Sequence, residues 1–208
     1  MPVIFSRKTD SGGVAAVWKI DETEEQLLQM FPCTKQMLLN VQSFRYAPRR
    51  LEWMASRALI YKLTQHIPHV IYNENGQPFV AQLNKSISIT HTKGFAAIAI
   101  SQNDIAGIDI EIPQQRILRI AERFLHPDEK LFIPPDKELE YDTLIWCAKE
   151  VLYKMIRRQD AVFNADLKVS PFALCHEGIL NTEELGVRAT HYQLNYITDS
   201  DYTLVWHC

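Results

Sequence analysis

The chain has 208 residues, of which 47% are hydrophobic, and its 22 Lys and Arg against 25 Asp and Glu give a net charge of −3. This length fits one large domain or two small ones, with enough apolar material for a core. The slight negative charge provides no basic field for binding nucleic acid. No apolar run reaches the roughly 18 residues of a membrane span. The N-terminus lacks a signal-peptide pattern, and the four cysteines lack metal-site spacing, so we expect free thiols and a cytoplasmic protein.

The first half of the chain predicts short strands around one long helix. Apolar residues from Leu51 to Leu59 recur with helical spacing after Pro48, which a first helical turn tolerates. Asn75-Gly76 is a hairpin turn signal. The predicted elements are, in order, a strand over Val14–Ile20, a helix from Asp21, the long helix from Pro48, hairpin strands Val70–Tyr72 and Phe79–Ala81, and strands Ser86–His91 and Phe95–Ser101.

The second half repeats this order of elements. The predictions are a strand over Ile105–Glu111, a helix over Gln114–Leu125, a long helix over Asp136–Arg158, and strands near Leu167–Cys175, Arg188–Thr198 and Tyr202–His207. We therefore expect an α+β fold. It would be a pseudo-dimer of two similar halves, residues 1–103 and 104–208, each a small, mainly antiparallel sheet packed on a long helix.

The strand Gly107-Ile-Asp-Ile-Glu111 places two carboxylates together. Alternation puts Asp109 and Glu111 on one face and the isoleucines on the other. Adjacent carboxylates repel each other unless a cation lies between them, and oxygen ligands suit Mg²⁺. A half-exposed strand with a solvated acidic face would show the same pattern.

The second long helix carries a mixed polar face. Trp146, Glu150 and Lys154 follow one another at four-residue intervals, and Lys149 lies about 100° round the helix, placed to reach a second anionic group. An ordinary helical ion pair between Glu150 and Lys154 is the alternative interpretation.

Further candidate anion ligands lie in the first half. His91 ends a strand beside Thr90, and this arrangement can hold a phosphate. Arg49, Arg50 and Arg57 lie off the apolar stripe of their helix, and guanidinium groups bind phosphate oxygens in pairs. A structural histidine and a solvated helix face are the alternatives.

Together these motifs resemble the surfactin-type (Sfp-like) 4'-phosphopantetheinyl transferases. The resemblance rests on Gly-Ile-Asp-Ile-Glu, on the later Trp-Cys-Ala-Lys-Glu-Val-Leu-Tyr-Lys, and on the strand ending in Ile-Thr-His that precedes both. Three further segments look like motifs of that family in its order: Glu52–Leu59, Asn75–Pro78 and Arg123–Glu129. Gln77 stands where the family often has lysine, so one phosphate contact would be missing or weaker.

The resemblance implies an enzyme that moves the 4'-phosphopantetheine arm of coenzyme A to a serine of an apo acyl or peptidyl carrier protein. It implies Mg²⁺, or Mn²⁺, held by Asp109, Glu111 and Glu150, with Glu150 also the base for the serine. Lys154 would neutralise phosphate charge as 3',5'-ADP leaves. The coenzyme phosphates would contact Arg50, Arg57, Thr90, His91, Lys149 and Lys154.

By the same resemblance, the first half would supply coenzyme contacts and the second half the metal and catalytic residues. Coenzyme and metal would lie between the halves of a monomer, with no nucleic acid or membrane as partner. Two other classes remain open from the residues. The same carboxylates would serve another metal-dependent phosphoryl-transfer or hydrolytic enzyme. A non-catalytic module of this fold that binds coenzyme A or a carrier would also keep these motifs.

Overall fold

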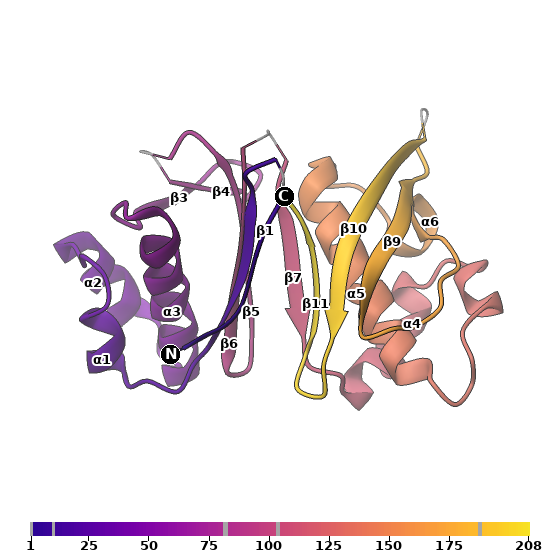
Figure 1. Cartoon of the computed structure of the whole chain (residues 1–208), viewed down its shortest axis with the longest axis horizontal. Coiled ribbons are helices and arrows are strands. Elements are labelled where there is room, and N and C mark those ends of the chain that lie inside the picture. The colour runs from indigo at the N-terminus through magenta and orange to yellow at the C-terminus, as the bar shows by residue number, and fades with distance from the viewer. Residues whose placement is uncertain (1, 10, 81–82, 103–104, 187–188) are drawn as a thin grey trace. The chain divides into compact units, whose positions relative to one another are not determined.

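The computed structural model describes residues 2–9, 11–80, 83–102, 105–186 and 189–208. The chain forms two compact units, Met1–Ala106 with Cys208 and Gly107–His207 (Figure 1). The predicted boundary between residues 103 and 104 falls outside the described residues. In the described part of the chain, no helix is long and apolar enough to cross a membrane. All four cysteines are free thiols.

The first unit is a four-stranded antiparallel sheet with helices on one face (Figure 1). The order across the sheet is β1-β2-β6-β5, and β3 pairs with β4 in a separate hairpin. The strands are β1 Val3–Lys8, β2 Val14–Lys19, β3 Val70–Tyr72, β4 Pro78–Val80, β5 Ser86–Thr92 and β6 Phe95–Ser101. The helices are α1 Glu24–Leu28, α2 Lys35–Ser43 and α3 Ala47–Thr64.

Local sequence signals explain where these helices begin. Thr23 forms a capping box with Gln26 at the start of α1, which satisfies two otherwise unpaired backbone N–H groups. Thr34 caps α2, because its side chain accepts a hydrogen bond from the backbone N–H of Met37. Helix α3 has proline in its first turn and buries one face, including Met54 and Leu59, in a core shared with β2, β5 and β6.

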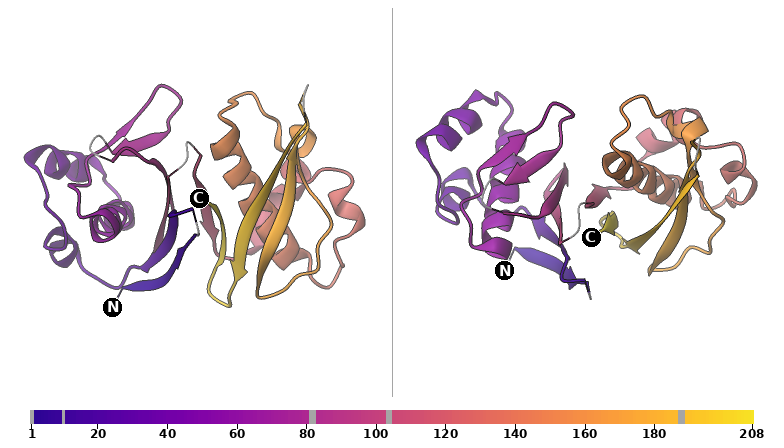
Figure 2. Two further views of the ribbon diagram at one scale, coloured as in Figure 1. Left: turned by 45° about the horizontal axis from the view of Figure 1, so that its top comes forward. Right: turned by 90° about the horizontal axis from the view of Figure 1, so that it is seen from above.

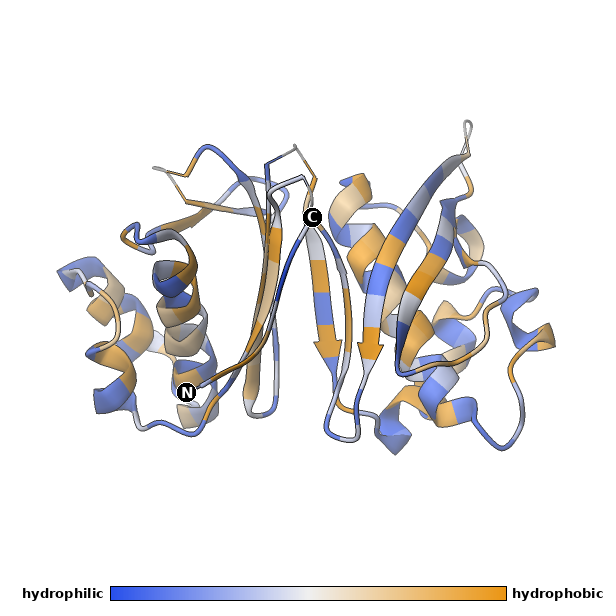
Figure 3. Cartoon of the chain, in the orientation of Figure 1, coloured by the Kyte–Doolittle hydropathy of each residue, from blue (hydrophilic) through white to orange (hydrophobic). Residues whose placement is uncertain are grey.

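The second unit is a five-stranded antiparallel sheet in the order β7-β11-β10-β9-β8. Helix α5 runs along one face of it and packs on β7 and β11 (Figures 1 and 2). The strands are β7 Gly107–Glu111, β8 Leu167–Val169, β9 Glu177–Glu184, β10 Thr190–Thr198 and β11 Thr203–His207. The helices are α4 Gln115–Phe124, the 3₁₀ turn η1 Glu129–Leu131, α5 Glu138–Ile156 and α6 Phe163–Asp166. Hydrophobic and hydrophilic residues alternate along β7 (Figure 3).

The predicted α+β class is confirmed, and so is each long helix. The strand predicted over Leu167–Cys175 is wrong in extent, because only Leu167–Val169 pairs with a neighbour. Among the described elements, five lack a prediction: β1, α2, η1, α6 and β9. Residues 81 and 188, at the ends of two predicted strands, lie outside the described residues. The pseudo-dimer is a statement about how the two units are arranged relative to each other, and it stays a prediction.

Gly107 permits the close packing of β7 on α5. A Cβ atom at this position would lie 2.8 Å from Val151 Cγ1 and 2.9 Å from Met155 Cγ, both on α5. Such distances are too short for real contacts, so any side chain here would push the helix and the strand apart. The distance between β7 and α5, and with it the distance between their polar side chains, therefore depends on this glycine.

We predict that Gly107→Ala destabilises the protein by about 1–3 kcal/mol, because the added methyl group overpacks the contact between β7 and α5. Urea unfolding of the variant and the parent protein measures the difference. Gly186→Ala is the matched control, since its Cβ would meet nothing closer than 3.4 Å. Equal unfolding free energies for the two variants would contradict this account of Gly107.

Candidate functional site

A polar cluster lies where β7 packs on α5 in the second unit. Lys154 Nζ donates hydrogen bonds to Asp109 Oδ1 at 2.8 Å and to the carbonyl oxygen of Ile108 at 2.9 Å. Asp109 is 5% exposed. Glu150 lies one helical turn before Lys154 on the same face of α5. The structure thus joins two predicted site residues, Asp109 and Lys154, that are distant in sequence.

The carboxylates of this cluster influence one another electrostatically. Burial, the charge of Asp109 and the charge of Glu111 raise the pKa of Glu150 to about 7, while Lys154 opposes the shift. Glu111 is also 3.4 Å from Arg116 Nη2 of α4. Burial, then the charges of Asp109 and Glu111, likewise raise the pKa of the Cys147 thiol. The cluster therefore holds excess negative charge in a partly desolvated place.

The donor chemistry of this cluster fits a hard divalent cation, because carboxylate oxygens are the ligands that Mg²⁺ takes in proteins. Burial, and after it the nearby carboxylates, raise the pKa of Glu150, and a bound cation would favour its ionised form. As the side chains stand, no three His, Cys, Asp or Glu in the described ranges form a group that could hold a metal ion. Lys154 lies against Asp109 instead. The ligand set of Asp109, Glu111 and Glu150 stays a prediction.

Lys149 is not available to a coenzyme phosphate, contrary to the expectation from its place on the helix. Its side chain is fully buried, and Nζ lies 2.7 Å from Glu129 Oε2, which is also fully buried. It donates two further hydrogen bonds, to the carbonyl oxygens of Phe124 at 2.6 Å and Phe163 at 3.0 Å. All three ammonium protons are thereby used. Burial lowers the pKa of Lys149 to about 8, although Glu129 favours the charged form.

Glu129 completes this buried pair. Its carboxylate also accepts hydrogen bonds from the backbone N–H of His126 and of Val169, each at 2.7 Å. The pair of Glu129 and Lys149 therefore connects α5 with the end of α4, with α6 and with β8. Glu129 ends the segment Arg123–Glu129, which resembles a family motif, but the sequence predicted no role for this residue. Two signals mark Lys149 as inward-facing: apolar Ile145 and Leu152 lie four residues before it and three after it.

In the first unit, His91 of β5 lies in a charged group with α3. Its Nδ1 atom is 3.0 Å from Glu52 Oε2 and 3.1 Å from Arg49 Nη1. The His91 side chain is 32% exposed, and that of Arg49 is 41% exposed. Thr90, the residue before His91, is nearly buried. Arg49 was a candidate anion ligand, but its contact with His91 and the role of Glu52 were not predicted; the three-residue spacing of Arg49 and Glu52 on α3 is the signal that joins them.

Arg57 is buried, at 4% exposure, beneath the ring of Trp53, whose centroid is 4.1 Å from the guanidinium carbon. Its Nη1 donates to Ser56 Oγ at 3.0 Å. Its Nε atom is buried without a hydrogen-bond partner among the described residues. Burial lowers the pKa of Arg57, and Tyr72 opposes the shift. An incompletely satisfied buried guanidinium is suited to an anionic ligand.

Arg50 has a structural position instead of the predicted phosphate contact. It donates to Glu24 Oε1 of α1 at 2.8 Å and to the carbonyl oxygen of Phe44 at 2.9 Å. These bonds hold the start of α3 to α1 and to the preceding loop. Gln77 lies in the β3–β4 turn, where its side-chain oxygen accepts a hydrogen bond from Asn73 Nδ2 at 3.0 Å.

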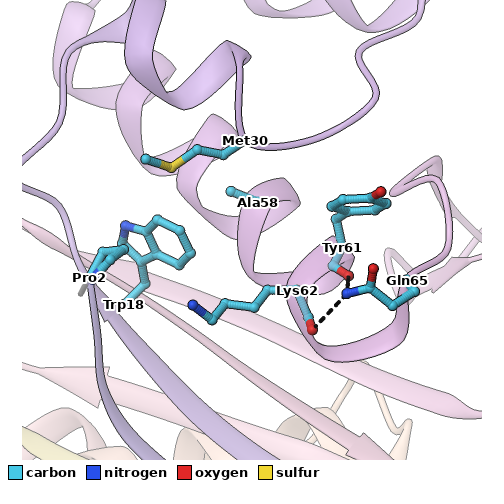
Figure 4. A pocket seen from close by; sticks show the side chains of 7 residues that line it. All are labelled: Pro2, Trp18, Met30, Ala58, Tyr61, Lys62 and Gln65. Carbon is cyan, nitrogen blue, oxygen red and sulfur yellow. Dashed lines mark hydrogen bonds between the residues drawn. The ribbon is translucent and has the colours of Figure 1, made fainter.

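A pocket of about 350 Å³ also lies in the first unit (Figure 4). Its lining residues are Pro2, Trp18, Met30, Ala58, Tyr61, Lys62 and Gln65. None of the predicted site residues belongs to it, so it carries no support for the predicted chemistry.

The buried pair gives a stability prediction. Lys149→Met leaves the Glu129 carboxylate buried without its cation, and we expect a loss of about 3–5 kcal/mol in unfolding free energy. Lys168→Met is the matched control, because Lys168 pairs with Asp128 at the surface, where such pairs contribute less than about 1 kcal/mol. Urea denaturation measures both. A Lys149 variant as stable as the Lys168 variant would contradict the structural role.

Comparison with known proteins identifies the class of this chain. Residues 105–204 match the model of the 4'-phosphopantetheinyl transferase superfamily. The chain is similar to 4'-phosphopantetheinyl transferase AcpT of Escherichia coli K12, with 29% identity over 136 residues that cover 59% of this chain and 70% of that protein. For AcpT of Salmonella typhi the identity is 27% over 112 residues, covering 51% and 58%. The match to the 4'-phosphopantetheinyl transferase superfamily thus lies in the second unit, and together with the similarity to AcpT it supports an enzyme of this class.

Proposed function

We propose that this protein is a surfactin-type enzyme that transfers 4'-phosphopantetheine from coenzyme A to a serine hydroxyl of an acyl or peptidyl carrier protein. The observation that carries the proposal is the contact of Lys154 with Asp109 beside Glu150, whose pKa is raised. All three residues lie in the segment that matches the superfamily. This cluster combines acidic and basic groups, as a reaction on a diphosphate requires.

The reaction forms one bond and breaks one at the β-phosphorus of the coenzyme diphosphate. The serine oxygen attacks this phosphorus, the bond to the bridging oxygen breaks, and 3',5'-ADP leaves. Glu150 is the proposed base for the serine proton, since a desolvated carboxylate with a raised pKa is a stronger base than an exposed one. Lys154 has its ammonium group in the same cluster, where it would compensate the charge that develops on the leaving phosphate.

Asp109, Glu111 and Glu150 are the residues proposed to hold Mg²⁺, or Mn²⁺, which when bound would supply charge neutralisation for the diphosphate. Arg57 and His91, with Arg49 beside His91, are proposed to bind anionic groups of the coenzyme. Arg57 Nε is buried without a hydrogen-bond partner among the described residues, and the side chains of His91 and Arg49 are partly exposed. Thr90 is a proposed hydroxyl contact. Lys149 has no part in this proposal, since its three donors are already used. Arg50 is left out because its guanidinium is held by Glu24 and by the carbonyl oxygen of Phe44.

We also propose that the protein acts as a monomer in the cytoplasm. Its four free cysteines suit a reducing compartment. Coenzyme A and an apo carrier protein are the partners this proposal requires.

Intact-mass measurement tests the proposed transfer. The full chain is incubated with coenzyme A, MgCl₂ and an apo carrier protein, and we expect the carrier to gain one phosphopantetheine. Glu150→Gln removes the base and should slow the transfer at least about 100-fold. Glu140→Gln is the matched control, because this glutamate is exposed on the same helix, and it should leave the rate unchanged.

Two results would contradict the proposal. One is no mass gain with several acyl and peptidyl carriers under conditions where the protein is folded. The other is phosphate or nucleotide release from coenzyme A without carrier modification, which would identify a hydrolytic enzyme.

A further inference from the structure

The pocket of the first unit is built on one face of α3. Four of its lining residues, Ala58, Tyr61, Lys62 and Gln65, follow the helical spacing i, i+3, i+4 and i+7. Ala58 is 1% exposed, and its side chain is a single methyl group, so the helix leaves room for a ligand at this point (Figure 4). The volume of about 350 Å³ lies in the range of sites that bind small molecules.

Aromatic and apolar groups form the walls of this pocket. Trp18 of β2 and Tyr61 supply rings, and Met30, which follows α1, supplies a thioether that is 38% exposed. Trp18 Nε1 donates a hydrogen bond to Glu22 Oε2 at 3.1 Å, which fixes the orientation of the indole. Aromatic rings pair favourably with one another, and thioether sulfur makes favourable contacts with ring edges. These walls therefore suit a flat aromatic group.

Lys62 is the charged residue of the lining. Its side chain is exposed, and its ammonium group has no partner among the residues that the structure describes. In Figure 4 this side chain runs toward Pro2 and Trp18. The amide of Gln65 turns back on α3 instead, where Nε2 donates to the carbonyl oxygens of Tyr61 and Lys62, each at 3.3 Å. No lining residue is acidic, so Lys62 is available to the charge of a ligand.

We propose that this pocket binds a small aromatic monocarboxylate. Its ring would lie against the two aromatic side chains and Met30, and its carboxylate would lie on the ammonium group of Lys62. A single negative charge is expected because the lining holds a single cation. The inference goes beyond the proposed function, since it concerns residues of the first unit alone and requires neither the metal nor the coenzyme.

Methionine NMR tests the position of the ligand. The full chain, labelled with carbon-13 in its methionine methyl groups, is titrated with indole-3-acetate. We expect a saturable shift of the Met30 methyl resonance, with a dissociation constant on the order of 1 mM or below. The resonances of Met37 and Met155, which are buried and lie outside the lining, should stay in place. Loss of the signal in Met30→Leu assigns it.

Two further titrations test the role of the charge. Lys62→Gln should weaken the binding of indole-3-acetate about twofold to fivefold, as expected for an exposed ion pair. The same variant should leave the binding of the neutral indole-3-acetamide unchanged, because the amide has no charge for Lys62 to compensate. Lys35→Gln is the matched control, since it removes the same charge from an exposed position of α2 outside the lining.

Several results would overturn the proposal. The site is refuted if the Met30 methyl does not shift at ten times the expected dissociation constant, or if only Met155 responds. Equal affinities of the acid and the amide for the parent protein, or equal losses in the Lys62 and Lys35 variants, would refute the carboxylate contact. Tighter binding of hexanoate than of indole-3-acetate would refute the aromatic class of the ligand.

Discussion

Like-charge crowding at the contact between β7 and α5 is the constraint on which the rest of the second unit depends. Asp109, Glu111 and Glu150 share a partly buried region, where burial and then the charges of Asp109 and Glu111 raise the pKa of Glu150 to about 7. Lys154 is the protein's own counter-ion, through its bond to Asp109. A fold that keeps such charges together gives up stability. The proposed function would account for the arrangement, because a polyanionic substrate and a cation need both signs of charge in one place.

Two features hold that cluster in position. Gly107 lets β7 approach α5, because any Cβ there would collide with Val151 and Met155. The buried pair of Glu129 and Lys149 then fixes α5 against its neighbours, using donors on backbone and side chain from several elements. Lys149 and Glu150 are adjacent in sequence, yet one supports the fold and the other faces the cluster. The packing of Lys149 therefore also fixes the position of Glu150, because both residues lie on α5.

Local sequence patterns predict much of the carboxylate cluster, but they do not predict the burial partner of Lys149 or strand β9. The two-residue alternation of a strand places Asp109 and Glu111 on one face of β7, and helical spacing places Glu150 and Lys154 on one face of α5. Both periodicities follow from local backbone geometry, so the sequence alone predicts them. Apolar neighbours at helical spacing mark Lys149 as inward-facing, but its partner Glu129 lies 20 residues away in sequence, and no local pattern predicts that pairing. Strand β9 was missed for a similar reason: its largely polar sequence has no clear alternation, and pairing with β8 and β10 holds it in the sheet.

The ionisation of Glu150 tests the central claim most directly. Carbon-13 NMR of the side-chain carboxyl, followed from about pH 4 to about pH 9, reports its pKa in the metal-free protein. The account predicts a midpoint near 7, which moves down when MgCl₂ is added, because a bound cation favours the ionised form. Assignment follows from loss of the signal in Glu150→Gln. A midpoint at the ordinary glutamate value of about 4.3, unaffected by MgCl₂, would contradict it.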